Sequence, residues 1–151
     1  MSRPRADELA AVAVGGVAGA LARAAISAAV PHRDAAAWPW ATFTTNLVGC
    51  LLLGVLLDWV DARHPIWSTT HPRRARHVRP LLASGVLGGF TTFSTFSVEA
   101  VRMSRAGSAG TAVAYAVASV ALGVTLVVAG RALGSSMFGA AELDLADDEA
   151  L

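Results

Sequence analysis

The amino-acid sequence predicts an all-α membrane protein with four transmembrane helices, the third of which is broken. Three observations carry this prediction. Hydrophobic residues make up 54% of the 151 residues and charged residues only 15%, which is too apolar for an ordinary soluble domain. Four apolar stretches are each long enough to cross a hydrocarbon core of about 30 Å. The third stretch contains a run of glycines and hydroxyl side chains that disfavours a continuous helix.

The four spans are expected to form one transmembrane domain over residues 1–134. They are predicted at residues 9–30, 38–60, 80–101 and 106–131. The first span contains a single charge, Arg23, and at 1.5 Å per residue it reaches roughly 33 Å. The second span carries Trp40 and Trp59, about 28 Å apart along a helix, which suits an aromatic anchor at each membrane interface. The other two spans have uncharged cores.

The charged residues concentrate outside the spans. Residues 61–79 are expected to form a polar loop, and residues 135–151 an acidic, disordered tail. All twelve basic residues are arginine, and four spans place eight of them on one face of the membrane: Arg3, Arg5, Arg63, Arg73, Arg74, Arg76, Arg79 and Arg131. The opposite face receives Arg33, Arg102 and Arg105. The positive-inside rule then predicts a cell (inner) membrane protein with both termini in the cytoplasm. This topology accounts for the arginines without a nucleic-acid partner.

The sequence GGFTTFSTFSVE, residues 88–99, interrupts the third span. It places five hydroxyl side chains within seven residues and ends on a carboxylate, Glu99. In lipid, backbone that leaves the helical hydrogen-bond ladder is tolerated only where it is buried in protein or faces a water-filled path. A helix break over residues 88–92 therefore predicts a pore or an ion site.

Two other spans carry narrow polar strips at helical spacing. Thr42 and Asn46 share one face of the second span, and Tyr115 and Ser119 share one face of the fourth. Each strip alone is more typical of helix packing, although amide and hydroxyl donors can also solvate an anion. Arg23 is costly in hydrocarbon and needs a partner such as Glu99 or an anionic permeant, or a position near the interface.

Aromatic rings alternate with hydroxyls in the third span. Phe93 and Phe96 are three residues apart and point the same way on a helix, while Thr95 and Glu99 fall on a neighbouring face. The edge of an aromatic ring carries positive electrostatic potential, so two edges along a path favour an anion without a full charge. Such a site binds weakly enough to release the ion, as conduction requires.

The side chains within the predicted spans exclude an enzyme, because they contain no nucleophile with a base beside it. The histidines, His32, His64, His71 and His77, all fall in predicted connections, so no serine within a span has a base beside it. The single cysteine, Cys50, cannot form an intrachain disulfide and is expected to be a packing residue. A proton-coupled small-molecule exporter of four-helix, dual-topology type is the alternative function, but the first span carries arginine where such an exporter needs an acid.

Together, these motifs resemble the CrcB/Fluc family of fluoride channels. The resemblance rests on residues 15–23 of the first span, Asn46 with its neighbouring glycines, residues 88–99, and Tyr115 with Ser119. It implies a fluoride-selective channel that exports cytoplasmic fluoride passively and so confers resistance to fluoride. The fluoride path that it implies comprises Asn46, Phe93, Thr95, Phe96, Glu99, Tyr115 and Ser119, with Arg23 in the vestibule.

The resemblance also implies an assembly. Family members are antiparallel dimers with two pores and a structural sodium ion (Na+), whose ligands here would be the backbone carbonyls of Gly88 and Thr91. A dual-topology homodimer needs nearly balanced arginines, yet eight lie on one face and three on the other. The partner subunit is therefore either a second copy or, as the hypothesis we favour, an oppositely oriented homologue.

Overall fold

The computed structural model describes residues 5–31 and 34–138, and every regular element in them is a helix. The helices are α1 (Ala6–Ala29), α2 (Trp40–Thr70), α3 (Pro72–Arg79), η1 (Pro80–Leu87), α4 (Gly88–Phe90), α5 (Phe93–Arg105) and α6 (Ala109–Phe138). Helices α3 to α5 together make the third span. Four helical stretches in the described residues are long and apolar enough to cross a membrane, which confirms the predicted four-span, all-α architecture.

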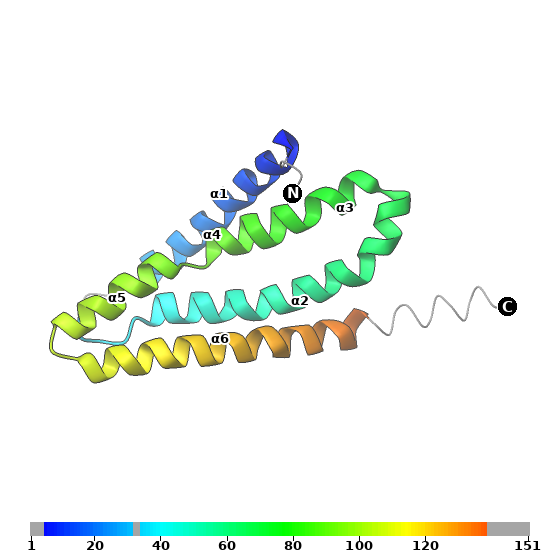
Figure 1. Cartoon of the computed structure of the whole chain (residues 1–151). Helices are drawn as coiled ribbons and strands as arrows, with labels where there is room; N and C mark the ends of the chain where they lie inside the picture. The colour runs from blue at the N-terminus through cyan, green and yellow to red at the C-terminus, as the bar shows by residue number, and fades with distance from the viewer. Residues whose placement is uncertain (1–4, 32–33, 139–151) are drawn as a thin grey trace.

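The helices associate in two pairs (Figure 1). Helix α2 runs beside α6, and α1 packs against η1 and α4. The N-terminus of α1, the α2–α3 turn and the end of α6 lie at one end of the molecule, and the α5–α6 turn lies at the other. The arginine-rich residues 61–79 and the pair Arg102 and Arg105 are therefore at opposite ends.

Glycines set the distance between α1 and the third span. A Cβ atom built on Gly19 would overlap the backbone of Val86, and one built on Gly89 would overlap the carbonyl of Gly16. Both positions require glycine because two helix backbones meet there without intervening side chains. By contrast, a Cβ on Gly16 would meet nothing within 4 Å. Close backbone packing thus fixes the third span on α1 next to the point where that span breaks.

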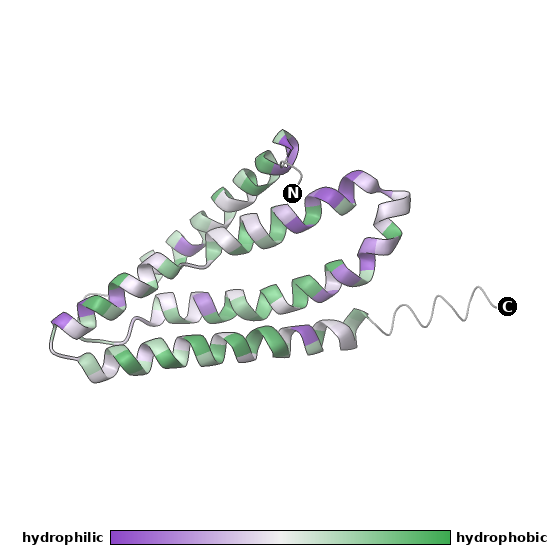
Figure 2. Ribbon diagram, in the orientation of Figure 1, coloured by the Kyte–Doolittle hydropathy of each residue, from purple (hydrophilic) through white to green (hydrophobic). Residues whose placement is uncertain are grey.

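The buried core is small and lies at the end of the molecule that holds the α5–α6 turn. Phe43, Met103, Ala112 and Tyr115 form it, and Trp38 packs edge-on against both Phe43 and Tyr115. Most other large apolar side chains point outward, and Figure 2 shows long hydrophobic stretches on every long helix. An apolar exterior of this kind is what a lipid bilayer solvates.

The third span breaks at two residues. Gly88 and Gly89 remain helical in α4, whereas Thr91 and Thr92 are extended, with φ and ψ of −79° and 162° and of −149° and 115°. The break predicted over residues 88–92 is thus narrowed to its last two positions. The glycines serve close packing instead, and the threonines, whose β-branched side chains suit extended backbone, leave the helix. Before α4 the chain forms η1, a π-helix, a rare form that is frequent at functional sites.

The connection predicted as a polar loop is helical. Helix α2 continues ten residues beyond the expected end of the second span at residue 60, and α3 begins at Pro72. Hydropathy marks where the lipid ends, whereas the helical hydrogen-bond ladder continues into water wherever the side chains permit it. The fourth helix begins at Ala109 because Gly107, at φ 84°, makes the preceding turn.

The fourth helix also runs further than expected. Helix α6 reaches Phe138, so residues 135–138 of the expected tail are helical. The remainder of the predicted disordered tail, residues 139–151, lies outside the described residues.

Candidate functional site

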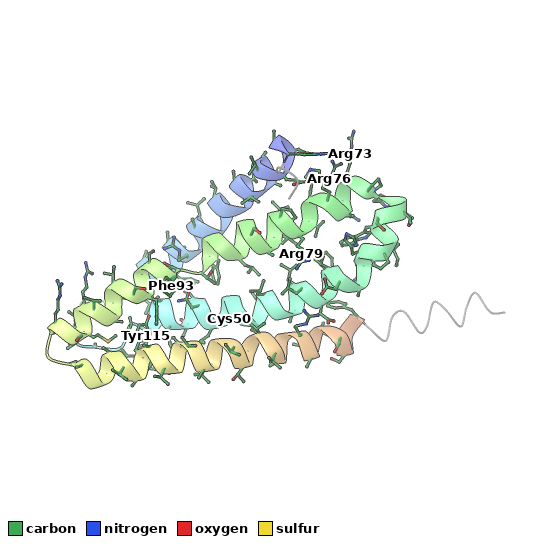
Figure 3. All side chains as sticks on the ribbon, in the orientation of Figure 1. Cys50, Arg73, Arg76, Arg79, Phe93 and Tyr115 are labelled. Carbon is green, nitrogen blue, oxygen red and sulfur yellow. The ribbon has the colours of Figure 1, made fainter. Side chains whose placement is uncertain are left out.

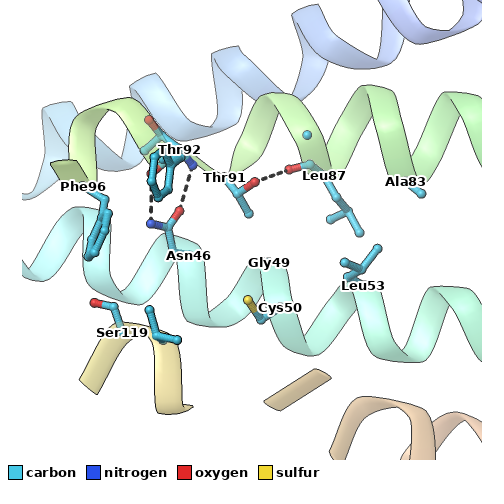
Figure 4. A pocket seen from close by; sticks show the side chains of 13 residues that line it. Asn46, Gly49, Cys50, Leu53, Ala83, Leu87, Thr91, Thr92, Phe96 and Ser119 are labelled. Carbon is cyan, nitrogen blue, oxygen red and sulfur yellow. Dashed lines mark hydrogen bonds between the residues drawn. The ribbon is translucent and has the colours of Figure 1, made fainter. Parts of the chain in front are cut away.

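Asn46 of α2 holds the helix break in place (Figure 4). The backbone N–H of Thr92 donates to Asn46 Oδ1 at 2.8 Å, and Asn46 Nδ2 donates to the Thr92 carbonyl at 3.1 Å. The carboxamide thus replaces the helical partners that Thr92 lacks, which buried backbone in lipid requires. One of the two N–H groups on Nδ2 is used in this way, and the other remains available as a donor.

Thr92 also starts the next helix. Its hydroxyl accepts a hydrogen bond from the backbone N–H of Thr95 at 3.1 Å, which makes it the N-cap of α5. The same hydroxyl donates to Thr95 Oγ1 at 2.9 Å. Thr95 therefore accepts from Thr92 and keeps its own hydroxyl hydrogen, which is a free donor for a ligand.

Glu99 joins three helices in the buried core. Its carboxylate accepts a hydrogen bond from Thr42 Oγ1 of α2 at 2.8 Å and another from the Tyr115 hydroxyl of α6 at 3.0 Å. Glu99 is 9% exposed and Tyr115 is fully buried. Two donors, each on one carboxylate oxygen, satisfy the hydrogen-bonding needs of this buried side chain. Arg23, the partner considered for Glu99 from the sequence, does not make this contact.

Three aromatic rings, those of Phe93, Phe96 and Tyr115, lead from the surface to this carboxylate. The ring centroids of Phe93 and Phe96 are 5.8 Å apart, and those of Phe96 and Tyr115 are 5.2 Å apart. Trp38 follows at 5.4 Å from Tyr115. Phe93 is 80% exposed at one end of this row, whereas Tyr115 is buried. The predicted pair on one face of α5 therefore forms in the structure, and it continues inward to Tyr115 and Glu99.

A central groove of about 350 Å³ runs along the break. It is lined by Asn46, Gly49, Cys50, Leu53, Ala83, Leu87, Gly88, Thr91, Thr92, Phe93, Phe96, Ser119 and Val120. The Ser119 hydroxyl is buried there, and no hydrogen-bond partner for it lies among the described residues. A buried hydroxyl without a partner is costly, so Ser119 is a donor in need of a ligand.

Arg23 contacts the other side of the broken span. Its Nε donates to the carbonyl oxygen of Gly89 at 3.2 Å, which connects α1 to the last helical turn before the break. The Thr91 hydroxyl donates back to the Leu87 carbonyl at 2.9 Å. The carbonyl oxygen of Thr91 itself accepts no hydrogen bond from any described residue. A backbone oxygen of this kind at a helix break is a suitable ligand for a hard cation.

The structure places most of the predicted site residues in two groups, and Thr95 and Arg23 lie outside both. Asn46, Phe93, Phe96, Ser119, Gly88 and Thr91 line the central groove, whereas Glu99 and Tyr115 lie in the core behind Phe96. Thr42 belongs to the second group, and the prediction of the site omitted it. Its spacing of four from Asn46 indicated a shared polar face, but nothing in the sequence paired it with Glu99.

These features define a class of protein: a multi-pass helical membrane protein whose third span breaks at a groove lined with hydrogen-bond donors and aromatic rings, as expected of an ion-conducting protein. A family described as CrcB-like protein, Camphor Resistance (CrcB) matches residues 10–131. Since the match covers most of the chain, the protein belongs to the CrcB family.

Relatives with high identity carry a more specific name. The fluoride-specific ion channel FluC 1 of Mycobacterium bovis is 49% identical over 121 residues, 80% of this chain and 84% of that protein. FluC 2 of Thermobifida fusca is 49% identical over 84 residues, 56% of each chain. FluC of Chloroflexus aurantiacus is 38% identical over 128 residues, 85% of this chain and 95% of that protein. These matches favour a channel over the exporter and over any enzyme.

Proposed function

We propose that this protein is a fluoride-selective ion channel that exports cytoplasmic fluoride passively and so confers resistance to fluoride. The observation that carries the proposal is the buried Ser119 hydroxyl, which has no partner among the described residues and lies in the same groove as Phe93 and Phe96. Relatives of nearly the same length are fluoride-specific ion channels. The chain works as a channel and not as an enzyme.

The donors in the groove suit a small anion. Dehydration of fluoride costs on the order of tens of kcal/mol in a Born estimate, so closely spaced donors must replace its water. Ser119 and the second N–H of Asn46, both on the groove wall, have hydrogen-bonding capacity left over, and so does Thr95, the residue before Phe96 in the chain. Ring edges of Phe93 and Phe96 add weak positive potential without a charge that would trap the ion. The Tyr115 ring packs on Phe96, and Glu99, bonded to the Tyr115 hydroxyl, ends the proposed path. Arg23 belongs to the proposed vestibule.

The functional unit in this proposal is a dimer of antiparallel subunits. The Phe93 side chain is 80% exposed, and it lies beside the groove in which the backbone of Thr91 and Thr92 leaves the helix. Lipid cannot satisfy the Thr91 carbonyl, so a second subunit that covers the groove removes an unpaired group from hydrocarbon. Each pore then takes side chains from both subunits.

A structural sodium ion belongs to the same proposal. The Thr91 carbonyl is unpaired among the described residues, and Gly88 is exposed in the groove, so both fit an oxygen-ligated cation. Two such breaks, facing each other across a two-fold axis, would offer four carbonyls. A bound sodium ion neutralises these dipoles where the subunits meet.

We further propose a cell (inner) membrane location with the arginine-rich end in the cytoplasm. In the described residues that end carries Arg5, Arg63, Arg73, Arg74, Arg76, Arg79 and Arg131, and the opposite end carries Arg102 and Arg105. A bias of this size favours one orientation. The partner subunit is accordingly an oppositely oriented homologue and not a second copy of this chain.

Fluoride efflux from proteoliposomes tests these statements together. The chain is purified from a host without other family members, reconstituted both alone and together with an added homologue, and compared in each case with Phe93→Ile, which keeps an apolar side chain but removes the ring edge. If the wild-type protein conducts fluoride in the absence of a proton gradient and Phe93→Ile does not, the channel proposal holds. Fluoride flux that requires a proton gradient would refute it.

The same liposomes separate the remaining proposals. Full fluoride flux from this chain alone refutes the heterodimer, and no flux until a homologue is added supports it. Replacing sodium by a large organic cation during purification should lower flux and dimer content. Unchanged flux and unchanged dimer content would show that the carbonyls of Gly88 and Thr91 hold no structural ion.

A further inference from the structure

A second, polar pocket lies at the arginine-rich end of the molecule, far from the central groove. It has a volume of about 450 Å³ and is formed where the last turns of α2 face α3 and the start of η1. Val60 and Pro80 form its inner wall, and these residues bound the apolar cores of the second and third spans. The pocket therefore begins where the hydrocarbon ends.

Two arginines dominate the charge of this pocket. Arg76 and Arg79 are three residues apart, so they share one face of the helix, and both line the pocket. Neither has a carboxylate within 4.0 Å among residues 5–31 and 34–138. The one carboxylate on the wall, Asp61, lies 3.3 Å from the guanidinium of Arg131. The pocket consequently keeps an excess of positive charge, to which His64 adds a ring nitrogen.

Other arginines nearby are engaged with aromatic rings. The guanidinium of Arg63 lies 5.2 Å from the centroid of Trp59, and that of Arg74 lies 5.8 Å from Trp67. The rings of Trp59 and Trp67 are themselves 5.1 Å apart. Tryptophans gather at the level of lipid headgroups, so this pair sets the depth of the pocket at the membrane interface.

We propose that this pocket binds the phosphate of an anionic phospholipid from the surrounding leaflet. Arg76 and Arg79 present planar guanidinium groups, which match phosphate oxygens with paired N–H donors. Figure 3 shows both side chains at the end of the molecule that holds the N-terminus of α1 and the α2–α3 turn. The depth set by the tryptophans favours a lipid phosphate over a soluble one, because acyl chains attached to that phosphate reach the apolar wall.

Native mass spectrometry of the purified, full-length protein tests this site. Phosphatidylglycerol, phosphatidylcholine and inorganic phosphate are titrated separately. The variant R76Q/R79Q should weaken the first bound phosphatidylglycerol about thirtyfold, from about fivefold per arginine near an anionic surface. The matched control is R73Q/R74Q, which removes the same charge from the same helix but outside the pocket wall. It should change binding less than about threefold.

A second variant keeps every charge. Ala75 lines the pocket, so Ala75→Phe should fill it and lower phosphatidylglycerol binding with both arginines in place. This variant also decides the question if R76Q/R79Q does not fold. Fluoride efflux should be unchanged in both, because the pocket is remote from the central groove.

Three results would overturn the proposal. Equal binding of phosphatidylcholine and phosphatidylglycerol would show that the headgroup charge is not recognised. Equal losses in the two double variants would show diffuse attraction without a pocket. Binding of inorganic phosphate in place of phosphatidylglycerol would assign the site to a soluble anion.

Discussion

Replacing Asn46 by alanine tests whether one side chain holds the helix break. The carboxamide makes two hydrogen bonds to the backbone of Thr92, at 2.8 and 3.1 Å, and Thr92 is only 9% exposed. In Asn46→Ala both backbone groups lose their partner. Each unsatisfied buried group costs about 1 to 3 kcal/mol, so we expect the free energy of unfolding to fall by about 2 to 6 kcal/mol.

The measurement is the apparent melting temperature of the protein in detergent. For a chain of this size 1 kcal/mol corresponds to about 2 to 4 °C, so the smallest expected shift is about 4 °C. Thr125→Ala is the matched control, because its exposed hydroxyl bonds only to the Ala121 carbonyl of its own helix, at 2.9 Å. That control should shift stability by less than about 0.5 kcal/mol. If the melting temperature of Asn46→Ala lies within about 1 °C of that of Thr125→Ala, a difference about as small as the reproducibility of the measurement, the carboxamide does not support the break.

Two further predictions concern contacts that the fold makes around the site. Gly19→Ala places a Cβ against the backbone of Val86 and should lower the free energy of unfolding by about 1 to 3 kcal/mol. Gly16→Ala, the control, has open space around its Cβ and should be neutral or stabilising in the same thermal assay. Equal effects of the two substitutions would contradict close packing of α1. Glu99→Gln keeps the shape of the side chain but leaves the Thr42 or Tyr115 hydroxyl facing an amide N–H, so it should cost about 1.5 to 3 kcal/mol and lower fluoride efflux. Wild-type melting and wild-type efflux would show that the pair of acceptor oxygens on Glu99 is dispensable.

The position of the helix break was predictable only in part. The sequence placed it within residues 88–92, because glycines and hydroxyls gather there in an otherwise apolar span. The low helix propensity of glycine predicted that Gly88 and Gly89 would leave the helix, yet Gly89 is helical because it packs on Gly16. Contacts with α1 overrode propensity, which describes a helix without neighbours.

The roles of the polar side chains depended on their partners. The sequence offered Asn46 as an anion donor or a packing residue, and the structure commits one of its N–H groups and its oxygen to Thr92. Likewise, Arg23 bonds to the Gly89 carbonyl and not to Glu99. Spacing of four residues predicts a shared face on one helix, but it contains no information about which face of another helix lies opposite.

The sequence by itself determined that this chain is a four-span helical membrane protein with an interrupted third span, because length, hydropathy and composition decide what lipid can solvate. It also indicated the family, because residues 88–99 of the motif are consecutive and can be recognised without knowledge of the fold. Only the tertiary structure decided where the helix breaks and which donors are left for an ion. Those depend on hydrogen bonds between residues about fifty positions apart, such as Thr92 with Asn46 and Glu99 with Thr42, and the chain brings these groups together only when the helices pack.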